Sequence, residues 1–392
     1  MKELKVYILL ILILFANNNL QAQDVKNQFN PVNTGVTSLS IAPDSRGGAM
    51  GDVGAATDPD VNSQFWNPAK YPFTISRAGV SLSYTPWLRQ LVNDIDLAYV
   101  AGYYRIGDYQ ALSASLRYFS LGEVTVGQSS AQDIGYTINP YEMSFDVGYS
   151  RMLSENLSAA VALRFIYSDL AYRQDEDVNP GSAFAADVAM YYNRYVMMGQ
   201  RECNLAFGMN ISNIGSKISY DSGNTSEFIP TNLRLGGSLL MPIDEYNTFA
   251  ISADANKLLV PTRPLQKDGE TDTDYQDRLQ RDYRDMSPIS GIFKSFSDAP
   301  GGFKEEMQEV QWSVGAEYTY HQQFSVRGGY HYENQNKGNR KYFSVGAGFK
   351  MNVFSLDAAY LISTAQSNPL DQTLRFSLSF DMDGIKDIFG KR

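Results

Sequence analysis

Residue types that commonly perform acid–base or nucleophilic chemistry are scarce in this sequence. The two histidines, His321 and His331, fall in or beside predicted strands, and Cys203 is the single cysteine. They lack the clustered histidines, cysteines and carboxylates expected of a zinc site, and they leave few choices for a general base. The glycine-rich run 47–51 has neither a preceding strand nor the Lys-Ser or Lys-Thr pair of a phosphate-binding loop. The sequence therefore predicts no catalytic residues, no metal site and no cofactor.

Charged residues instead recur at alternate positions of apolar segments. In residues 157–168, apolar side chains alternate with small or charged ones, and several other segments repeat this period of two. Successive side chains of a strand point to opposite faces, so the pattern predicts strands with one apolar and one polar face. A dry core would not accept so many charges, whereas the polar interior of a barrel would. The charged residues that we assign to this inner face are Asp96, Arg117, Asp146, Arg164, Asp187, Arg234, Asp254, Glu317, Arg327, Asp357 and Arg375.

The assignment of faces in residues 93–105 follows the same reasoning. The apolar set there includes Leu97, Tyr99 and Tyr103, and the opposing set includes Asp96. Because the outer face of a membrane barrel is apolar, we expect the first three side chains to face lipid and Asp96 to face the lumen.

Together the segments predict an all-β fold, a transmembrane antiparallel β-barrel of about fourteen strands within residues 78–392. A strand of roughly 9–11 residues crosses a bilayer at a tilt, and only closure satisfies the edge hydrogen bonds in lipid. Short and long gaps alternate, as in outer-membrane barrels with short periplasmic turns and long surface loops. We expect an outer-membrane protein of a Gram-negative bacterium with its longest loop, 258–309, on the cell surface. The expected strand starts lie near residues 78, 94, 110, 141, 157, 183, 204, 232, 248, 310, 324, 341, 353 and 372.

Composition and the amino-terminal segment are consistent with export. The chain has 392 residues, a formal net charge of −10 and 13% aromatic residues. An acidic chain lacks the basic surface of a nucleic-acid-binding protein, whereas abundant aromatics fit the girdles of a membrane barrel. Residues 1–22 predict a cleaved signal peptide, because Lys2 and Lys5 precede a short apolar run and Ala22 is a small residue suited to cleavage.

Residues 23–77 show little alternation and are rich in glycine and small residues, which permit close approach of backbone segments. Within them, Asn67-Pro68-Ala69 follows a glycine-rich run, and this arrangement resembles the amino-terminal hatch of FadL-type outer-membrane transporters. The resemblance implies that residues 23–77 fold into the lumen as a plug, with Trp66, Asn67 and Pro68 as hatch residues. We interpret Trp66 and Asn67 as holding the hatch in place rather than binding a ligand.

A closer resemblance extends over nearly the whole chain. Segments 37–66, 81–88, 257–262, 297–302 and 366–376 resemble the PorV, or LptO, family of outer-membrane barrels of the Bacteroidetes type IX secretion system. The resemblance implies a non-enzymatic cargo shuttle in outer-membrane lipid. Its expected partners are the translocon barrel of the SprA or Sov type, cargo with a C-terminal sorting domain, and the sortase-like peptidase PorU, which attaches cargo at the cell surface.

Such a shuttle should expose apolar groups on its outer loops, where aromatic anchors commonly dominate binding. In the longest loop, the four-residue spacing of Tyr275, Leu279 and Tyr283 predicts a surface helix. Two alternatives stay open, since Trp87 could instead belong to an aromatic belt and the loop phenylalanines could pack on their own helix. The residues that we expect to bind partners, from three loops, are Trp87, Leu88, Leu91, Phe293, Phe296, Phe303, Asn368 and Pro369.

The main alternative function is a FadL-like outer-membrane channel for hydrophobic small molecules, which would need an apolar pocket behind the hatch. The charges assigned to the lumen argue against it. A passive porin is less consistent with a plug, and soluble β-sandwich repeats are less consistent with strands of this length.

Overall fold

The computed structural model describes residues 29–89, 92, 94–126, 136–170, 179–221, 226–267, 269–351, 353–364 and 372–381. The predicted signal peptide, Leu91, Asn368 and Pro369 lie outside the described residues.

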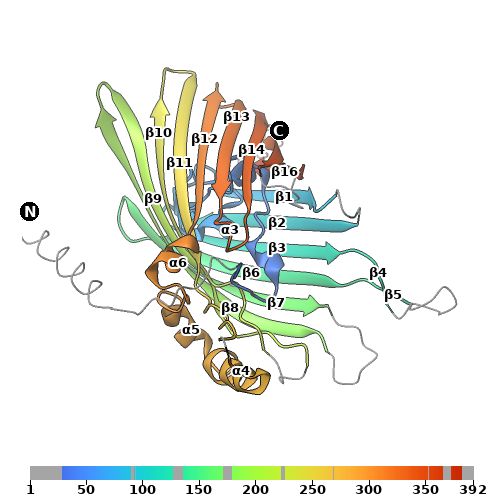
Figure 1. Ribbon diagram of the computed structural model, residues 1–392. Helices are drawn as coiled ribbons and strands as arrows, with labels where there is room; N and C mark the ends of the chain where they lie inside the picture. The colour runs from blue at the N-terminus through green and yellow to red at the C-terminus, as the bar shows by residue number, and fades with distance from the viewer. Residues whose placement is uncertain are drawn as a thin grey trace, which may run out of the picture.

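Fourteen antiparallel strands close into a barrel in which β1 pairs with β16 (Figure 1). This confirms the predicted fold class. A separate two-stranded sheet, β4–β5, lies in the gap between β3 and β6. The wall consists of β1 (Ala78–Pro86), β2 (Ile95–Ile106), β3 (Gln110–Leu121), β6 (Tyr141–Met152), β7 (Leu157–Asp169), β8 (Gly181–Met198), β9 (Arg201–Gly215), β10 (Asn232–Pro242), β11 (Asn247–Leu258), β12 (Gln311–Tyr320), β13 (Phe324–Tyr332), β14 (Lys341–Met351), β15 (Phe354–Ser363) and β16 (Leu374–Asp381), while β4 is Val124–Val126 and β5 is Tyr136–Ile138.

The predicted strand starts agree with the structure to within three residues, and the largest offset is at β9, which begins at Arg201. The β8–β9 hairpin is longer than predicted, with strands of 18 and 15 residues that meet at a tight turn. The charged residues Arg194, Arg201 and Glu202 interrupt the apolar alternation there. The alternation of apolar and polar residues is therefore lost from the sequence there, although β8 and β9 stay paired along the backbone.

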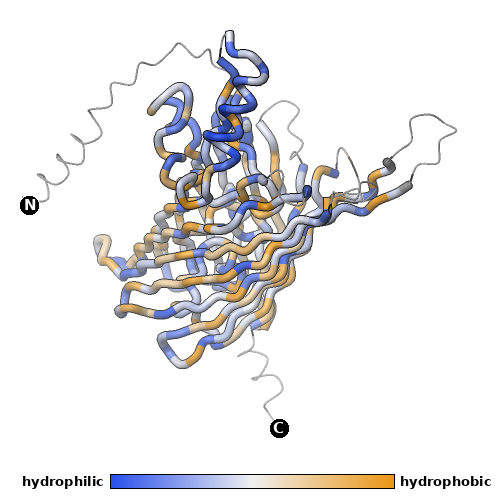
Figure 2. Tube along the Cα trace, turned by 90° about the horizontal axis from the view of Figure 1, so that it is seen from below, coloured by the Kyte–Doolittle hydropathy of each residue, from blue (hydrophilic) through white to orange (hydrophobic). Residues whose placement is uncertain are grey.

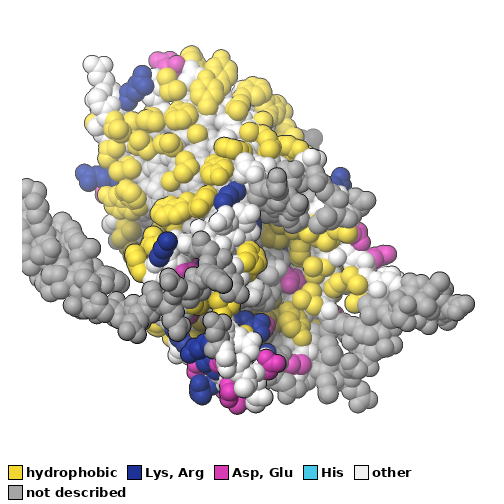
Figure 3. Space-filling view, viewed as in Figure 1, with side chains coloured by type: hydrophobic (Ala, Val, Ile, Leu, Met, Phe, Trp, Pro, Cys, Tyr) yellow, Lys and Arg dark blue, Asp and Glu magenta, His cyan; other side chains and the backbone are white. Residues whose placement is uncertain are grey.

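Alternation of burial along the strands follows the predicted two-residue period. Hydrophobic and hydrophilic residues are likewise interspersed along the strands (Figure 2). In β7, Ala162 and Arg164 face the interior and are buried, while Val161 and Leu163 are exposed on the outer face. Apolar side chains cover the wall over β9–β14 in the space-filling view, and charged side chains gather near α4 at the loop end (Figure 3). Lipid-facing and lumen-facing residues therefore separate as in membrane barrels.

The face assignment in β2 was wrong. Leu97, Tyr99 and Tyr103 are buried on the inner face, and Asp96 lies on the outer face, where it accepts a hydrogen bond of 2.6 Å from the Tyr84 hydroxyl. The physical reason is that the lumen at β2 is filled with protein rather than water. Tyr103 stacks on Tyr71 of the amino-terminal segment, with 4.9 Å between ring centroids.

The two ends of the barrel differ in their connections. The hairpins β2–β3, β6–β7, β8–β9, β10–β11, β12–β13 and β14–β15 close with turns of two to four residues at one end. Long connections lie at the other end, and the longest joins β11 to β12. No helix among the described residues is long and apolar enough to cross a membrane.

Among the described residues, short helices occur in two places. Inside the ring of strands lie η1 (Thr37–Ser40), α2 (Ser45–Ala49), α3 (Ser63–Trp66) and η2 (Pro68–Phe73), and we call residues 37–77 the plug (Figure 1). Between β11 and β12 lie α4 (Asp272–Leu279), the π-helical turn η3 (Gln280–Arg284), α5 (Pro288–Lys294) and α6 (Phe303–Gln308), and we call residues 259–310 the surface insert. Side-chain caps begin several of these helices, with Asp44 at α2, Asn67 at η2, Thr271 at α4 and Ser287 at α5.

Candidate functional site

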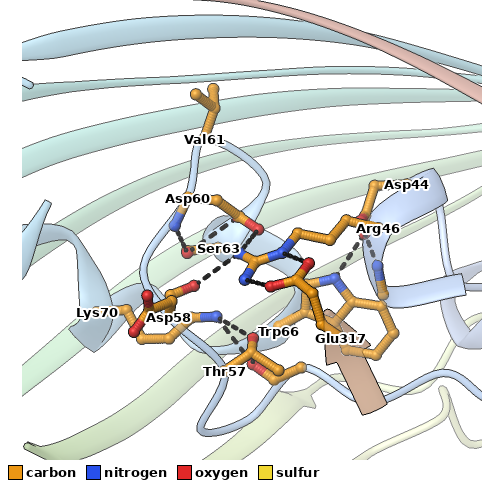
Figure 4. Close-up of polar contacts among 12 residues, drawn as sticks. Asp44, Arg46, Thr57, Asp58, Asp60, Val61, Ser63, Trp66, Lys70 and Glu317 are labelled. Atoms are coloured by element: carbon orange, nitrogen blue, oxygen red, sulfur yellow. Dashed lines mark hydrogen bonds and ion pairs between the residues drawn. The ribbon is translucent and has the colours of Figure 1, made fainter. Parts of the chain in front are cut away.

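The plug contacts the barrel wall through buried charges. Arg46 forms ion pairs of 2.9 Å with both Asp60 of the plug and Glu317 of β12 (Figure 4). Glu317 also pairs with Arg327 of β13 at 2.5 Å, and Arg327 continues the chain of charges to Asp357 of β15 at 2.5 Å. Three of the predicted inner-face charges, Glu317, Arg327 and Asp357, are therefore linked by ion pairs, and the plug supplies a further partner through Arg46.

The predicted hatch residues lie at the centre of the plug and make structural contacts. Trp66 is buried, and its indole N–H donates to the Asp44 carboxylate at 2.6 Å (Figure 4). The Asn67 amide donates to the carbonyl oxygens of Ala55 and Met190, each at 2.9 Å, and so joins the plug to β8. Pro68 occupies the first turn of η2, where its missing N–H needs no partner.

Backbone donors of the plug are satisfied by the wall. The amides of Gly54 and Ala55 donate to Asp254 of β11 at 2.8 and 2.9 Å. Gly208 of β9 allows this close approach, because a Cβ atom there would lie 1.9 Å from the Ala55 carbonyl oxygen. The sequence did not identify these contacts, although the glycine-rich composition of the plug indicated close backbone approach in general.

A cavity of about 450 Å³ lies between the plug and the short-turn end of the barrel. Its lining includes Ile75, Phe349 and Phe354, but the walls nearest the plug carry charged side chains. The charged lining residues are Arg46, Asp58, Asp60, Glu317, Arg327, Lys350, Asp357 and Asp381.

The surface insert is held to the barrel by a second group of charges. Lys257, at the end of β11, pairs with Glu306 at 3.0 Å and with Glu309 at 2.5 Å. Lys337, in the β13–β14 loop, pairs with Glu305 at 2.6 Å and with Glu309 at 3.0 Å. We call these five residues the anchor. Sequence reasoning missed it, and the only signal was the three glutamates at the start and end of the α6 region.

Asp298 lies beside the anchor and accepts a hydrogen bond of 3.0 Å from the Thr262 amide. Burial and the neighbouring Glu306 raise the pKa of the Asp298 carboxyl to about 7. The attachment of the insert therefore includes a carboxyl that changes charge near neutral pH.

An apolar cluster forms the inner side of the insert. Leu279 and Tyr283 are buried against Phe228 of the β9–β10 loop and Val260, as the four-residue spacing predicted for a surface helix. Lys217 also contacts this cluster. Its ammonium donates to the Arg284 carbonyl at 2.7 Å and lies 4.0 Å from the Phe228 ring centroid.

The outer side of the insert exposes apolar side chains. Phe293 is 74% exposed, Phe296 50% and Phe303 75%, and the neighbouring Ile289 and Met307 are also exposed. We call these five residues the α5–α6 face. The three predicted phenylalanines are thus brought together in one insert, and they do not pack beneath its helices.

The β1–β2 loop is less exposed. Trp87 and Leu88 are half-buried, the Trp87 amide donates to the Ile95 carbonyl at 2.8 Å, and Leu88 has a positive φ of 53°. These residues continue the β1–β2 hairpin, and no contact joins them to the surface insert among the described interactions.

Comparisons with known proteins identify a family. The sequence profile of the family described as "Type IX secretion system protein PorV" matches residues 23–265. No curated protein matches the chain.

Several solved structures are similar to the chain at low sequence identity. The Ralstonia pickettii toluene transporter TbuX has 12% identity and a TM-score of 0.43, with 87% of this chain and 96% of that chain covered. The Pseudomonas putida toluene transporter TodX has 10% identity and a TM-score of 0.48, with 90% and 99% covered. A Pseudomonas aeruginosa FadL homologue has 11% identity and a TM-score of 0.43, with 90% and 99% covered. No functional conclusion follows from likeness at this level.

Proposed function

The chain belongs to the PorV family of type IX secretion system proteins, and from that premise we propose that it shuttles secreted cargo at the outer membrane. It is an outer-membrane barrel component of that system. In the proposed role, the protein takes cargo with a C-terminal sorting domain from the translocon barrel of the SprA or Sov type and passes it to the sortase-like peptidase PorU. Residues 1–22 act as the signal peptide, and bond cleavage and attachment belong to the peptidase.

The observation that carries the proposal is the α5–α6 face. Three phenylalanines are exposed on an insert, and the ion pairs of the anchor attach the base of this insert to the barrel. Exposed apolar groups on an ordered support favour binding, because the surface need not be ordered when the partner arrives. Aromatic side chains are also enriched among the residues that dominate binding energies.

Two further loops contribute at the same end of the barrel in this proposal. Trp87 and Leu88 are half-buried in the β1–β2 loop, and we assign Leu91 of the same loop to this docking role as well. Asn368 and Pro369 act in the β15–β16 loop. We assign these residues a supporting role, because the α5–α6 face has the larger exposed aromatic surface.

The direct test is capture of a cargo sorting domain by purified protein in detergent. We expect Phe293→Ala, Phe296→Ala and Phe303→Ala together to weaken capture at least tenfold, since individual anchors commonly contribute more than 1 kcal/mol. The matched control replaces three exposed phenylalanines of the outer wall, Phe184, Phe207 and Phe343, by alanine. Unchanged capture by the insert variant would remove this face as the docking site.

The cellular test is deletion of the gene. We expect cargo with type IX sorting domains to accumulate in the periplasm or to be released unprocessed. Complementation with the wild-type chain should restore surface attachment, whereas the insert triple variant should not. Normal surface attachment in the deletion strain would contradict the secretion role itself.

The cavity beside the plug gives little support to the alternative function, a channel for hydrophobic small molecules. That cavity of about 450 Å³ is large enough for a small molecule, but Arg46, Asp60 and Glu317 line its plug side. Apolar ligands usually occupy predominantly apolar pockets. Bound lipid in the lumen of the purified protein would favour the channel over the shuttle.

A further inference from the structure

The first described residues lie among the surface loops rather than inside the lumen. The Asn30 amide donates to the Asn336 carbonyl in the β13–β14 loop at 2.9 Å, and the Gly35 amide donates to the Phe228 carbonyl in the β9–β10 loop at 2.9 Å. Between them, Val32 packs against the apolar cluster that contains Leu279 and Tyr283 of the surface insert. We call residues 29–36 the strap, because they contact three loop regions at once.

The fit at Gly35 is close. A Cβ atom at this position would lie 2.8 Å from Cγ2 of Ile218 and 3.4 Å from Cβ of Glu227. A larger residue would push the strap away from the β9–β10 loop, which also carries Phe228. The strap is therefore seated in a defined position against the support of the insert.

The strap continues directly into the plug. Val36 and Leu39 join a buried cluster with Ile166 and Ile218 of the wall and loops. Ser38 donates through its amide to Glu142 at 3.2 Å, and a few residues later Arg46 enters the ion pairs with Glu317. One continuous segment thus contacts the surface insert at its beginning and the luminal charges at its middle.

The direction of the chain follows from these contacts. The strap lies at the long-loop end, whereas β1 begins at Ala78 beside the short-turn end, where Ala78 pairs with Tyr104. The segment therefore crosses the lumen from the long-loop end to the short-turn end, and we expect these ends to face the cell surface and the periplasm, as in other outer-membrane barrels.

From these contacts we propose that the strap couples the plug to the surface insert, so that the α5–α6 face is held in place only while the plug is seated. Loosening the plug withdraws the strap from Phe228, Leu279 and Tyr283, and the insert then loses its apolar support. One consequence of the coupling rests on the proposed function: cargo docking would depend on whether the plug is seated. The physical coupling itself can be measured without cargo.

Hydrogen exchange of the purified protein in detergent provides the test. We expect Val32→Asp to lower the protection of the amides of residues 279–283 at least tenfold, because a carboxylate would replace an apolar contact. We expect Arg46→Gln, which removes ion pairs within the plug and to Glu317 of the wall but touches no residue of the insert, to lower the same protection at least threefold. Ile75→Asp is the control, since Ile75 is 99% exposed at the far end of the same segment.

A cross-link distinguishes loss of protection that passes through the strap from a general destabilisation of the protein. Asn30→Cys with Asn336→Cys, in a Cys203→Ala background, would fix the strap where its backbone already bonds to the loop. We expect the oxidised form to restore protection of residues 279–283 in the Arg46→Gln variant, and the reduced form not to restore it. Unchanged protection in Val32→Asp, an equal loss in Ile75→Asp, or a loss that persists after cross-linking would each overturn the proposal.

The direction of the segment is tested on intact cells. Phe29→Cys in the Cys203→Ala background should react with a membrane-impermeant maleimide before the outer membrane is permeabilised, because Phe29 is 63% exposed. Labelling only after permeabilisation would place the strap on the periplasmic side of the membrane and overturn the proposal. None of these three experiments involves cargo, so a failure of the docking proposal would leave their results unaffected.

Discussion

Ion pairs attach both the plug and the surface insert to the barrel, but the two regions differ in the exposure of their aromatic side chains. In the plug, Arg46 and Glu317 fix the segment to the wall, and Trp66 is buried at its centre. In the insert, Lys257 and Glu309 fix the base, and Phe293 is left exposed. Charges thus attach both regions, but the insert buries Tyr283 on its inner side and exposes phenylalanines on its outer side, as a surface suited to binding would. This comparison predicts how differently the two regions should respond to substitution.

The largest effect is expected from Trp66→Ala. The substitution leaves a cavity beside Gly47 and Gly54, which both lie against the Trp66 ring, and it removes the donor to the buried Asp44 carboxylate. Truncation of a buried tryptophan commonly costs about 3–5 kcal/mol, and we expect the upper part of that range. Thermal unfolding in detergent, followed by the heat-dependent gel shift, measures it. Loss below about 1 kcal/mol would show that the plug is not packed as described.

The second effect concerns the luminal charges. Glu317→Gln leaves Arg46 and Arg327 without their shared carboxylate, and breaking a buried pair commonly costs about 3–5 kcal/mol. We expect about 3 kcal/mol, because Asp60 and Asp357 still pair with the two arginines. Urea unfolding in detergent provides the measurement. The outward Tyr318→Phe on the same strand is a suitable control, and an equal loss there would contradict the assignment.

A smaller effect, dependent on pH, is expected in the insert. Because the pKa of the Asp298 carboxyl is raised from 3.8 to about 7, the folded protein binds more protons than the unfolded chain between these values. Attachment of the insert should therefore weaken as pH rises from about 4 to about 7 and stay constant above, according to this linkage.

Limited proteolysis of the insert at pH 5 and pH 8 measures this change. We expect faster cleavage at pH 8 in the wild-type chain and a reduced difference in Asp298→Asn, whose amide oxygen can still accept from Thr262. An unaltered pH response in Asp298→Asn would assign the effect to another group.

The smallest effect on stability is expected from Phe293→Ala. Because the side chain is 74% exposed, the free energy of unfolding should change by less than about 0.5 kcal/mol. Thermal unfolding beside the Trp66→Ala variant gives a direct comparison of one exposed and one buried aromatic. A loss approaching that of Trp66→Ala would mean that Phe293 packs inside the insert, and the contrast between the regions would not hold.

The wall was largely predictable from sequence because its signal is local. The two-residue period specifies strands without reference to the rest of the chain, and it located Arg164, Arg327 and Arg375 on the inner face, where they are buried. It failed at Asp96, because the face of β2 depends on whether the lumen holds water or protein. The contact between Tyr71 and Tyr103 is tertiary and leaves no local pattern in either segment.

The candidate site was predictable only in outline. Loop position and composition indicated Phe293, Phe296 and Phe303, but whether they are exposed depends on how the insert folds back on Lys257 and Lys337. Those lysines are far from the glutamates in sequence, so no spacing connects them. The strap was not predicted for the same reason, since its hydrogen bonds to Phe228 and Asn336 join distant backbone atoms.

Closure of the wall between its first and last strands has a consequence for biogenesis. The described segment in front of β1 runs from the long-loop end through the ring of strands to the short-turn end, and β1 then pairs with β16. A segment packed this closely cannot easily enter a ring that is already closed. We therefore expect the seam between these two strands to pair last, after the amino-terminal segment has been enclosed.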